Sequence, residues 1–386
     1  MVKPKICIII GNYKAPWAEA IKNNTREIIN QLSEKYDIFC IGPSTNTSKK
    51  IIDGKITSYL IKSPLYLTKF KRVFYPFGII NLIIKGKKII KEEQPDIIIS
   101  NLESPSVGFV GSKLKKYAKE NTKFIQIVNA EYYSYNKTPL KYWFLDDLPH
   151  LLFNNKTFFK AGLKKADKNI IITKLLLEKI KQMGIENVVY IPYGVNLKKF
   201  KKTNLKKQKE FTVGYLGHLI YAKGAGLLLD AFIELSKKHN LRLNLATTWG
   251  SEEDKLKNIN NSKIINFGTL KNPESFYNSC NLFILPLRMP FATLNLPQVL
   301  LEAQACETPV LASDLDNIKE LIVDKKTGFL FERNNKRDLM NKIIQIYKNQ
   351  ENLENIAENA LKNIKSSYDL LKTVNQVDSL IKELLK

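Results

Sequence analysis

The stretch from residue 281 to residue 313 constrains the fold of this 386-residue chain more than any other. It contains an apolar run at Leu282–Leu285, a proline-bearing loop, a helical segment that begins near Pro297, and a second apolar run at Pro309–Ala312. Strand, loop, helix and strand in this order are typical of a parallel α/β sheet, in which ligands bind beyond the carboxyl ends of the strands.

One carboxylate lies inside this otherwise uncharged helical segment. It belongs to Glu302, and an unpaired ion in such surroundings is costly. The sequence therefore predicts that a polar partner or a ligand contacts the Glu302 carboxylate.

The length and the charge of the chain limit its architecture and its partners. Because a single core stops growing well below 386 residues, two domains are expected. The net charge of +24 arises from 61 Lys and Arg residues against 37 Asp and Glu residues. Such an excess indicates an anionic partner, namely nucleotide or lipid phosphates, an anionic membrane surface or nucleic acid. A codon bias towards Lys, Asn and Ile is the alternative explanation.

Cysteine usage and hydropathy indicate the compartment. The four cysteines are far apart, no Cys-x-x-Cys or Cys/His cluster occurs, and there are only three histidines, so we expect a reducing cytosol and no zinc site. No apolar run approaches the ~20 residues of a membrane-spanning helix, and the N-terminal run is too short for a signal peptide. We therefore expect a cytoplasmic protein that is soluble or peripheral.

The first half of the chain alternates strand and helix patterns. The strand-like runs are Ile6–Ile10, Ile38–Ile41, Ile97–Ser100, Phe124–Val128, Asn169–Ile172 and Val188–Ile191. The helical patterns between them include Thr25–Glu34, Gly108–Ala118 and Leu175–Met183. Asn24 and Glu27 predict a capping box at the start of the first helix. Strands alternating with helices predict a parallel sheet.

The second half repeats this alternation after a change of composition. Residues 197–210 are mostly Lys, Asn and Gln, which predicts a linker between two lobes. The series that follows is Phe211–Leu216, Gly224–Lys237, Leu241–Ala246, Ile264–Phe267 and Pro273–Ser279, then residues 281–313, two short β-like runs around 325–328, and helices at Lys336–Lys348, Leu353–Ser366 and Leu370–Leu385. Two doubly wound lobes place the ligand site in the cleft between them.

A glycine and a lysine lie where a predicted strand meets a predicted helix in residues 213–232. Gly217 at the strand end lets a ligand approach the backbone, and the helix that opens at Gly224 offers free amides that favour an anion. Lys223 adds a full positive charge at the same place. An ordinary turn with a solvated lysine is the alternative.

Taken together, several segments resemble the glycosyltransferases of the GT-B fold, family 4, the large retaining group also called group 1. The matching segments are 191–200, 213–224, 268–287, 300–313 and 316–332. They cover the second lobe and its lead-in, whereas the first lobe is similar only in its strand–helix rhythm. The resemblance implies an acceptor-side Rossmann-like domain at 1–195, a nucleotide-sugar-binding Rossmann-like domain at 210–366, and a C-terminal helix at 367–386 that crosses back to brace the first domain.

The resemblance also implies roles for residues of the second lobe. The lysine of the family's KG motif, which contacts the donor diphosphate, matches Lys223, and the position of its usual arginine partner falls at His218. The second glutamate of the family's E-x7-E motif, which holds the donor ribose hydroxyls, matches Glu302. A buried structural carboxylate is the alternative for Glu302.

Other donor-binding positions depart from the family pattern. The first glutamate of the E-x7-E motif falls at Leu294, so its contact to the sugar is absent or rebuilt. The candidates to replace it are Asn295, Leu296 and Pro297. Further donor-binding candidates are Gly217, Leu270 and Glu320, and a carboxylate that caps a helix start is the alternative for Glu320.

The first lobe contributes candidates through its loops. Gly11 and Asn12 follow the first predicted strand, and Asn129 and Glu131 follow the strand that ends at Val128. Members of the family often carry a histidine near that second position to contact the transferred sugar. This chain has none there, so Asn129 or Glu131 is the substitute that we expect.

A basic segment with interleaved aromatic residues runs from Gly54 to Lys91 and contains no acidic residue. Its basic residues are Lys55, Lys62, Lys69, Lys71, Arg72, Lys85, Lys87, Lys88 and Lys91, and its aromatic residues are Tyr59, Tyr66, Phe70, Phe74, Tyr75 and Phe77. This composition suits anionic lipid headgroups, so we expect Lys55–Lys91 to contact a membrane surface. A solvated lysine-rich face over a core helix is the alternative.

The resemblance therefore implies a glycosyltransferase that moves a sugar, with retention, from a nucleotide-diphosphate sugar to a glycan or lipid-linked acceptor in cell-envelope polysaccharide or glycoconjugate synthesis. No metal or other cofactor is expected, because Lys223 and helix amides can neutralise the leaving diphosphate. One alternative is a catalytically impaired GT-B scaffold, since Leu294 and His218 depart from the family pattern. A basic nucleic-acid-binding protein is another, although it explains the charge and not Glu302.

Overall fold

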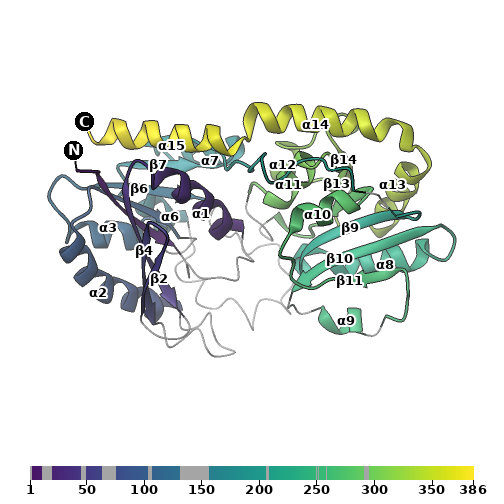
Figure 1. Cartoon of the computed structure of the whole chain (residues 1–386), viewed down its shortest axis with the longest axis horizontal. Coiled ribbons are helices and arrows are strands. Elements are labelled where there is room, and N and C mark those ends of the chain that lie inside the picture. The colour runs from purple at the N-terminus through teal and green to yellow at the C-terminus, as the bar shows by residue number, and fades with distance from the viewer. Residues whose placement is uncertain are drawn as a thin grey trace. The chain divides into compact units, whose positions relative to one another are not determined.

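The computed structural model describes residues 2–10, 20–44, 49–62, 75–102, 107–130, 156–205, 208–248, 250, 252–257, 259–290 and 295–386. The chain forms two compact units, of which the first comprises Met1–Ile191 with Thr373–Lys386 and the second Pro192–Lys372. Each unit is an α/β structure around its own largely parallel sheet (Figure 1). The predicted fold class is confirmed.

The first unit contains an eight-stranded sheet. In spatial order its strands are β3 (Lys49–Asp53), β4 (Ile56–Lys62), β2 (Asp37–Ser44), β1 (Lys5–Ile10), β5 (Ile97–Asn101), β6 (Lys123–Val128), β7 (Lys168–Ile171) and β8 (Val188–Tyr190). Neighbouring strands are parallel except β3 and β4, which are antiparallel. The edge strand β3 and its neighbour β4 were not predicted, because they mix polar and apolar residues and lack the continuous apolar run of a central strand.

Helices cover both faces of this sheet. They are α1 (Ala20–Leu32), α2 (Tyr75–Glu93), α3 (Phe109–Lys115), α6 (Lys156–Leu163) and α7 (Lys174–Gln182). Alternate residues of β1, such as Cys7 and Ile9, pack in one core with Leu82 of α2 and Leu114 of α3. The predicted capping box is wrong, because α1 begins at Ala20 and Asn24 lies buried inside it.

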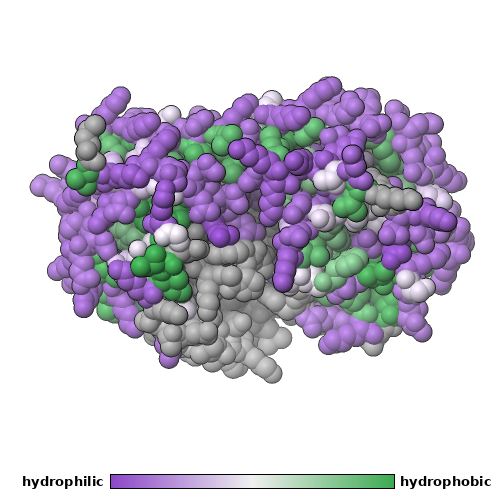
Figure 2. All heavy atoms as spheres, in the orientation of Figure 1, coloured by the Kyte–Doolittle hydropathy of each residue, from purple (hydrophilic) through white to green (hydrophobic). Residues whose placement is uncertain are grey.

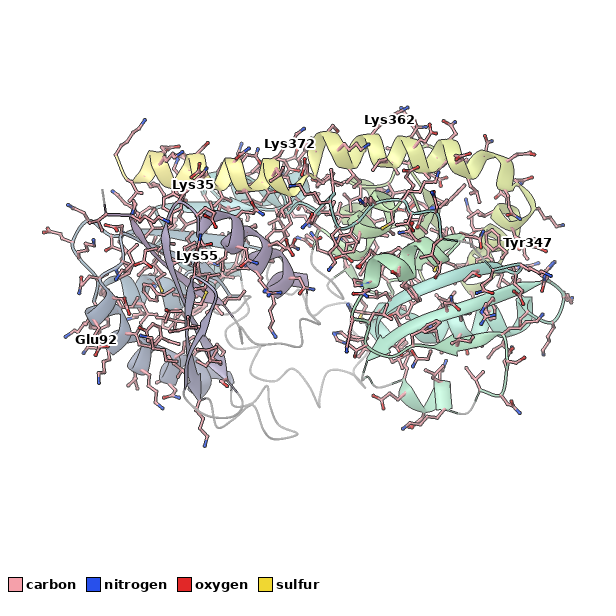
Figure 3. All side chains as sticks on the ribbon, viewed as in Figure 1. Lys35, Lys55, Glu92, Tyr347, Lys362 and Lys372 are labelled. Carbon is pink, nitrogen blue, oxygen red and sulfur yellow. The ribbon has the colours of Figure 1, made fainter. Side chains whose placement is uncertain are left out.

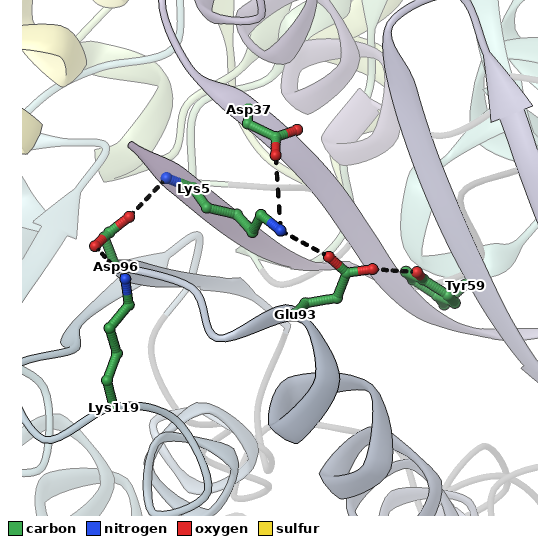
Figure 4. A network of polar contacts seen from close by, with 6 residues as sticks. All are labelled: Lys5, Asp37, Tyr59, Glu93, Asp96 and Lys119. Atoms are coloured by element: carbon green, nitrogen blue, oxygen red, sulfur yellow. Dashed lines mark hydrogen bonds and ion pairs between the residues drawn. The ribbon is translucent and has the colours of Figure 1, made fainter. Parts of the chain in front are cut away.

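Ion pairs and hydrogen bonds connect the amino ends of β1, β2 and β5 (Figure 4). The Lys5 ammonium group lies 3.0 Å from Glu93 and 3.8 Å from Asp37. Asp96 accepts a 2.7 Å hydrogen bond from the Lys5 backbone N–H and another of 2.7 Å from Lys119. These contacts fix the amino ends of the strands, opposite to the carboxyl ends at which ligands bind.

The second unit contains a six-stranded parallel sheet. In spatial order its strands are β11 (Ile264–Asn266), β10 (Leu241–Thr248), β9 (Phe211–His218), β12 (Leu282–Leu285), β13 (Val310–Ser313) and β14 (Phe329–Phe331). The strand order reverses between β9 and β12, which is the switch point of a doubly wound sheet.

Helices of the second unit pack around this sheet (Figure 1). They are α8 (Ala225–Leu235), α9 (Glu253–Lys257), α10 (Pro273–Ser279), α11 (Gln298–Ala305), α12 (Asp316–Lys319), α13 (Lys336–Lys348) and α14 (Leu353–Ser367). Leu228 of α8 and Leu339 of α13 share one core with Val213 of β9. The Tyr347 ring, labelled in Figure 3, meets that of Phe211 edge-on with the centroids 5.5 Å apart.

The lysine-rich segment predicted as a linker belongs to the second unit, since the division between the units lies at Ile191 and Pro192. The amide oxygen and the amide nitrogen of the Asn278 side chain, on α10, both form hydrogen bonds with this segment. The Asn278 Oδ1 accepts a 2.8 Å hydrogen bond from the Thr203 N–H, and its Nδ2 donates one of 3.0 Å to the Lys201 carbonyl. Hydrogen bonds between the Asn278 side chain and the backbone of this segment therefore attach it to α10, although its composition alone suggested a linker.

The C-terminal helix α15 (Leu370–Leu384) crosses from the second unit to the first. Asp378 on α15 is buried and accepts hydrogen bonds from the Tyr36 hydroxyl at 2.7 Å and the Lys35 ammonium at 2.8 Å. Lys35 lies beside α15 in Figure 3, whereas the Lys372 ammonium group donates a 2.7 Å hydrogen bond to the Ser366 carbonyl. The hydrogen bonds from Lys35, Lys382 and Tyr36 outweigh burial and lower the pKa of Asp378 to about 2.

Replacing Asp378 with asparagine is expected to lower the free energy of unfolding by about 2 kcal/mol at pH 7. The pKa of the carboxyl group is lower in the folded state, so its contribution is present above pH 3.8 and is lost as the pH falls through about 2. Urea unfolding of the variant and the wild type at several pH values measures the difference. The exposed Asp254→Asn is the control, and a loss that does not shrink with acid would contradict the assignment.

Candidate functional site

The carboxyl ends of β9 and β12 are neighbours at the switch point of the second sheet. The chain leaves β9 at His218, forms the short 3₁₀ helix η3 (Tyr221–Lys223) and enters α8. Gly224 joins them with a φ of 75°, and a Cβ atom there would lie 1.8 Å from the carbonyl oxygen of Pro286. Only glycine fits this turn, which therefore holds η3 against the segment that follows β12.

Lys223 is a half-buried cation. The described part of the chain provides no hydrogen bond or ion pair to its ammonium group. The Lys223 Cδ atom lies 3.6 Å from the position that a Cβ atom would take on Gly217, so the side chain passes the end of β9. Burial lowers the pKa of Lys223, because desolvation disfavours its charged form. This environment favours an anionic ligand over the alternative of a solvated lysine.

The first turn of α8 already holds a carboxylate. The Gly226 N–H donates a 3.0 Å hydrogen bond to Oε2 of Glu252. A carboxylate is favourable at a helix N-terminus, because it meets the positive end of the helix dipole and an amide that lacks a helical partner. The expectation that the opening amides of α8 are free for a ligand is therefore wrong at Gly226.

Glu302 lies on α11 and receives a hydrogen bond from α10. Its Oε2 accepts a 2.7 Å hydrogen bond from the hydroxyl of Tyr277, which is fully buried. The Tyr277 ring packs edge-on against Phe283 of β12 with the centroids 5.2 Å apart, so the hydroxyl is firmly positioned. Within the described residues the Oε1 atom has no hydrogen-bond partner. The predicted polar partner of Glu302 is thus Tyr277, and one carboxylate oxygen remains for a ligand.

The surroundings of Glu302 shift its titration towards neutral pH. Burial raises the pKa of Glu302 to about 7, because desolvation disfavours the carboxylate. The Tyr277 hydrogen bond and the positive charge of Lys199 oppose this shift. A perturbed carboxylate with a free oxygen at a switch point is a candidate ligand contact.

The predicted residues at the start of α11 lie close to a further polar side chain. Leu296 and Pro297 are buried, and the Asn295 carbonyl accepts a 3.4 Å hydrogen bond from Asn317. Gln298, the first residue of α11, lies four residues before Glu302 and therefore on the same helix face. Its buried Nε2 atom has no hydrogen-bond partner among the described residues. A ligand contact at Asn295, Leu296 and Pro297 remains a prediction.

The remaining donor-binding candidates lie near other strand ends. His218 ends β9, and its carbonyl accepts a 3.0 Å hydrogen bond from the Tyr215 hydroxyl. Leu270 lies in the turn after the edge strand β11. Glu320 directly follows α12, so the alternative that it caps a helix start is wrong, and Asp316 occupies that start. The roles of His218, Leu270 and Glu320 in donor binding remain predictions.

In the first unit, Asn129 joins a chain of buried polar side chains at the carboxyl ends of β5 and β6. Its Nδ2 donates a 2.7 Å hydrogen bond to Oδ1 of Asn101, whose Nδ2 donates one of 2.6 Å to the Thr25 hydroxyl on α1. Contact of Asn129 with a sugar remains a prediction. The predicted site residues Gly11, Asn12 and Glu131, and the departure at Leu294, lie outside the described residues.

Part of the basic segment is engaged within the first unit. Lys55 forms a 2.7 Å ion pair with Glu34, and the ammonium groups of Lys87 and Lys91 lie 4.6 and 5.9 Å from the centre of the Tyr117 ring. The basic and aromatic residues that lie outside the described ranges are Tyr66, Lys69, Phe70, Lys71, Arg72 and Phe74. Figure 2 shows that hydrophilic residues are abundant on the face in view. Charged side chains at such a surface are solvated, which accommodates the net charge of +24.

Three features of the described residues bear on cofactors and compartments. No group of three or more His, Cys, Asp or Glu side chains within the described ranges could hold a metal ion. No helix in the described part of the chain combines the length and the apolar character needed to cross a membrane. The four cysteines are buried free thiols.

The sequence analysis missed Tyr277 and Arg288. Tyr277 gives no signal in the sequence, since a tyrosine on the apolar face of a helix is ordinary core. Arg288 does give one, because it is the only charged residue between Glu274 and Glu302 and lies three residues after the predicted strand that ends at Leu285. A lone arginine at the carboxyl end of a parallel strand is placed where ligands bind.

Residues 196–363 match the family described as Glycosyl transferases group 1. An uncharacterised glycosyltransferase of Methanocaldococcus jannaschii is 25% identical over 334 residues, which cover 86% of this chain and 87% of that protein. The capsular polysaccharide biosynthesis glycosyltransferase CapM of Staphylococcus aureus is 24% identical over 350 residues, which cover 86% of this chain and 89% of that protein.

Solved structures share the fold of the whole chain. Sucrose-phosphate synthase from Thermosynechococcus elongatus has a TM-score of 0.79 and 18% identity, with 99% of each chain covered. HepE from Anabaena, in complex with UDP and glucose, has a TM-score of 0.73 and 16% identity, with 98% of this chain and 99% of that chain covered. At this level of identity the likeness concerns the fold.

Proposed function

We propose that this chain is a group 1 glycosyltransferase with the GT-B fold and that it moves a sugar from a nucleotide-diphosphate sugar to a glycan or lipid-linked acceptor in cell-envelope polysaccharide or glycoconjugate synthesis. The observation that carries the proposal is the half-buried Lys223, without an anionic partner in the described residues, at the switch point of the second sheet. The capsular role named for CapM and the UDP and glucose bound to HepE support this class of product and donor.

In the proposed reaction Lys223 pairs with the donor diphosphate and Glu302 accepts hydrogen bonds from the ribose hydroxyls. The bond between the sugar C1 atom and the diphosphate oxygen breaks, and the acceptor oxygen bonds to C1 on the same face. The acceptor proton passes to the departing phosphate oxygen, so the reaction retains configuration and requires no protein base. Cationic side chains stabilise the leaving diphosphate, and we propose that the reaction needs no metal.

A thermal-shift screen with UDP-, GDP- and ADP-sugars tests the donor proposal. Ligand at about 100 times its Kd stabilises a protein by about 2.7 kcal/mol, so one nucleotide class is expected to raise the Tm by several degrees. The shift is expected to persist in EDTA, because the cations that meet the diphosphate belong to side chains. Inorganic phosphate at the same concentration is the control. If no nucleotide sugar raised the Tm above that control, the donor proposal would be wrong.

We also propose that α2 contacts an anionic membrane surface, from the cytoplasmic side, to reach a lipid-linked acceptor. Ile80 and Ile84 lie one helical turn apart on α2 and are 51% and 64% exposed. Lys85 and Lys88 are exposed beside them. Exposed apolar residues flanked by lysines suit the boundary between lipid headgroups and acyl chains, and each cation near the surface contributes about 1 kcal/mol.

Replacing both Ile80 and Ile84 with aspartate is expected to weaken binding to vesicles that contain phosphatidylglycerol by at least about 10-fold. The substitution removes apolar burial and adds two charges that an anionic surface repels. Co-sedimentation with anionic and with neutral vesicles measures the effect. Val323→Asp, at an equally exposed apolar residue of the second unit, is the control. Equal sedimentation of the wild type with both kinds of vesicle would contradict the proposal.

A further inference from the structure

Backbone contacts join two segments of the second unit just beyond the ends of β9 and β12. The Arg288 N–H donates a 2.9 Å hydrogen bond to the Ala222 carbonyl. The Pro286 carbonyl occupies the space that a Cβ atom on Gly224 would need. Residues 286–288 are therefore fixed against η3, and Arg288 is held at the switch point of the sheet.

The Arg288 guanidinium group lies over an aromatic ring and lacks a hydrogen-bonding partner among the described residues. Its Cζ atom is 4.3 Å from the centre of the Tyr221 ring. The Nε atom is buried without a hydrogen-bond partner, and the described residues offer the guanidinium no ion pair. Contact with the ring restrains the guanidinium group but satisfies none of its N–H donors, and burying such donors unpaired is costly.

Arg288 and Lys223 bring two cations without anionic partners to the same three-residue helix. Arg288 contacts its first residue, Tyr221, and Lys223 is its last. The carboxylate of Glu252 binds the Gly226 amide in the next turn and forms no ion pair with either cation within 4.0 Å. The desolvated Lys223 ammonium group and the unpaired Arg288 Nε–H donor are each unfavourable until an anion meets them. A ligand with two neighbouring negative groups fits this requirement.

We propose that Arg288 is the second cation of the donor site and binds the diphosphate of the nucleotide sugar together with Lys223. This inference deepens the proposed function and rests on it. A guanidinium fork matches two phosphoryl oxygens at once, which an ammonium group cannot do. His218, which the family pattern pairs with Lys223, is charged only when it is protonated, whereas a guanidinium group is a permanent cation. Tyr221 acts as the positioning residue of Arg288.

Calorimetric titration of the full chain with UDP, GDP, inorganic pyrophosphate and the matching nucleosides tests the inference. Arg288→Gln is expected to weaken binding of pyrophosphate and of the preferred nucleoside diphosphate by roughly 10- to 150-fold, the range for hydrogen bonds to charged groups. Nucleoside affinity is expected to stay unchanged. Arg288→Lys should recover part of the loss, and Tyr221→Leu should show a smaller loss. Arg333→Gln, at an exposed position, is the control.

The outcomes separate this inference from the proposed function. If the wild type bound UDP or GDP and Arg288→Gln bound it equally well, the role of Arg288 would be overturned and the donor proposal would stand. Equal losses for nucleoside and diphosphate would indicate a disturbed fold around β12 and would also overturn the role. If the wild type bound no diphosphate, the proposed function itself would fail.

A measurement on the wild type covers the case in which Arg288→Gln does not fold. Phenylglyoxal modifies accessible arginines, and peptide mass mapping locates the products. Saturating pyrophosphate or nucleoside diphosphate is expected to suppress modification at Arg288, whereas the nucleoside alone is not, and Arg333 should react in every sample. Unchanged modification of Arg288 under saturating diphosphate would overturn the inference.

Discussion

Methionine in place of Lys223 is expected to lower kcat/KM for the nucleotide-sugar donor by roughly 10- to 150-fold. The range follows from the loss of a hydrogen bond to a charged group, about 1.5–3 kcal/mol, with each 1.4 kcal/mol worth a factor of ten. Methionine keeps an apolar stem beside Gly217, where the Lys223 Cδ atom lies 3.6 Å from the position that a Cβ atom would take, so the end of β9 stays packed. Steady-state kinetics with the donor concentration varied measures the effect.

The same substitution is expected not to destabilise the protein. Burial lowers the pKa of Lys223, which means that the folded state disfavours the charged form that the substitution removes. Loss of donor use with an unchanged or higher Tm would therefore identify Lys223 as a ligand contact. Lys237→Met, at an exposed residue beyond the end of α8, is the matched control. Wild-type kinetics in Lys223→Met would show that the assignment is wrong.

Kinetics also decide between an active enzyme and a catalytically impaired scaffold. The departures at His218 and Leu294 motivate the scaffold alternative. A wild-type chain that binds a nucleotide sugar but transfers nothing to any glycan or lipid-linked acceptor would support it. Transfer that Lys223→Met abolishes would exclude it.

Local signals made much of the second unit predictable. The limits of α10, Pro273–Ser279, and of β12, Leu282–Leu285, agree with the sequence expectation. Proline at the first helical position and a continuous apolar run each act within a few residues, so no long-range information is needed. The edge strand β3 has neither signal, and its Ile52 is 70% exposed, because its place depends on pairing with β4.

The candidate site was predictable only where its residues are neighbours in sequence. Gly217, Lys223 and Gly224 form one strand–turn–helix pattern, which singled out Lys223. The contact between Tyr277 and Glu302 joins residues 25 positions apart, and the carboxylate that binds the Gly226 amide comes from Glu252, 26 positions away. Such partners follow from the order of strands in the sheet, which sequence periodicity does not determine.

Glutamine in place of Glu302 is expected to stabilise the ligand-free protein at high pH. Burial raises the pKa of Glu302 from 4.5 to about 7, so the folded state holds this proton more tightly than the unfolded state does. The stability that this provides is fully present below pH 4.5 and is lost as the pH rises to about 7, where the buried carboxylate ionises. Glutamine is neutral throughout, so the variant is expected to gain about 3 kcal/mol over the wild type at pH 8.5 and less than about 1 kcal/mol at pH 5.

The same variant is expected to use the donor at least about 10-fold less well at pH 8.5, because a carboxylate accepts hydroxyl hydrogen bonds more strongly than a neutral amide does. Below pH 7 protonation of Glu302 weakens donor use by the wild type, so the difference in donor use between the wild type and the variant should become smaller. Tyr277→Phe removes a hydrogen bond that lowers the pKa of Glu302. The pH at which donor use by this variant rises should therefore be higher than in the wild type.

Urea unfolding and donor kinetics between pH 5 and pH 8.5 measure the two effects of Glu302→Gln, with the exposed Glu358→Gln as control. A buried carboxylate in α11 that lowers the free energy of unfolding benefits the protein only if the carboxylate binds a ligand. Higher stability together with weaker donor use would therefore identify Glu302 as a ligand contact. A variant that gained stability and kept wild-type kinetics at every pH would leave Glu302 as a structural carboxylate held by Tyr277.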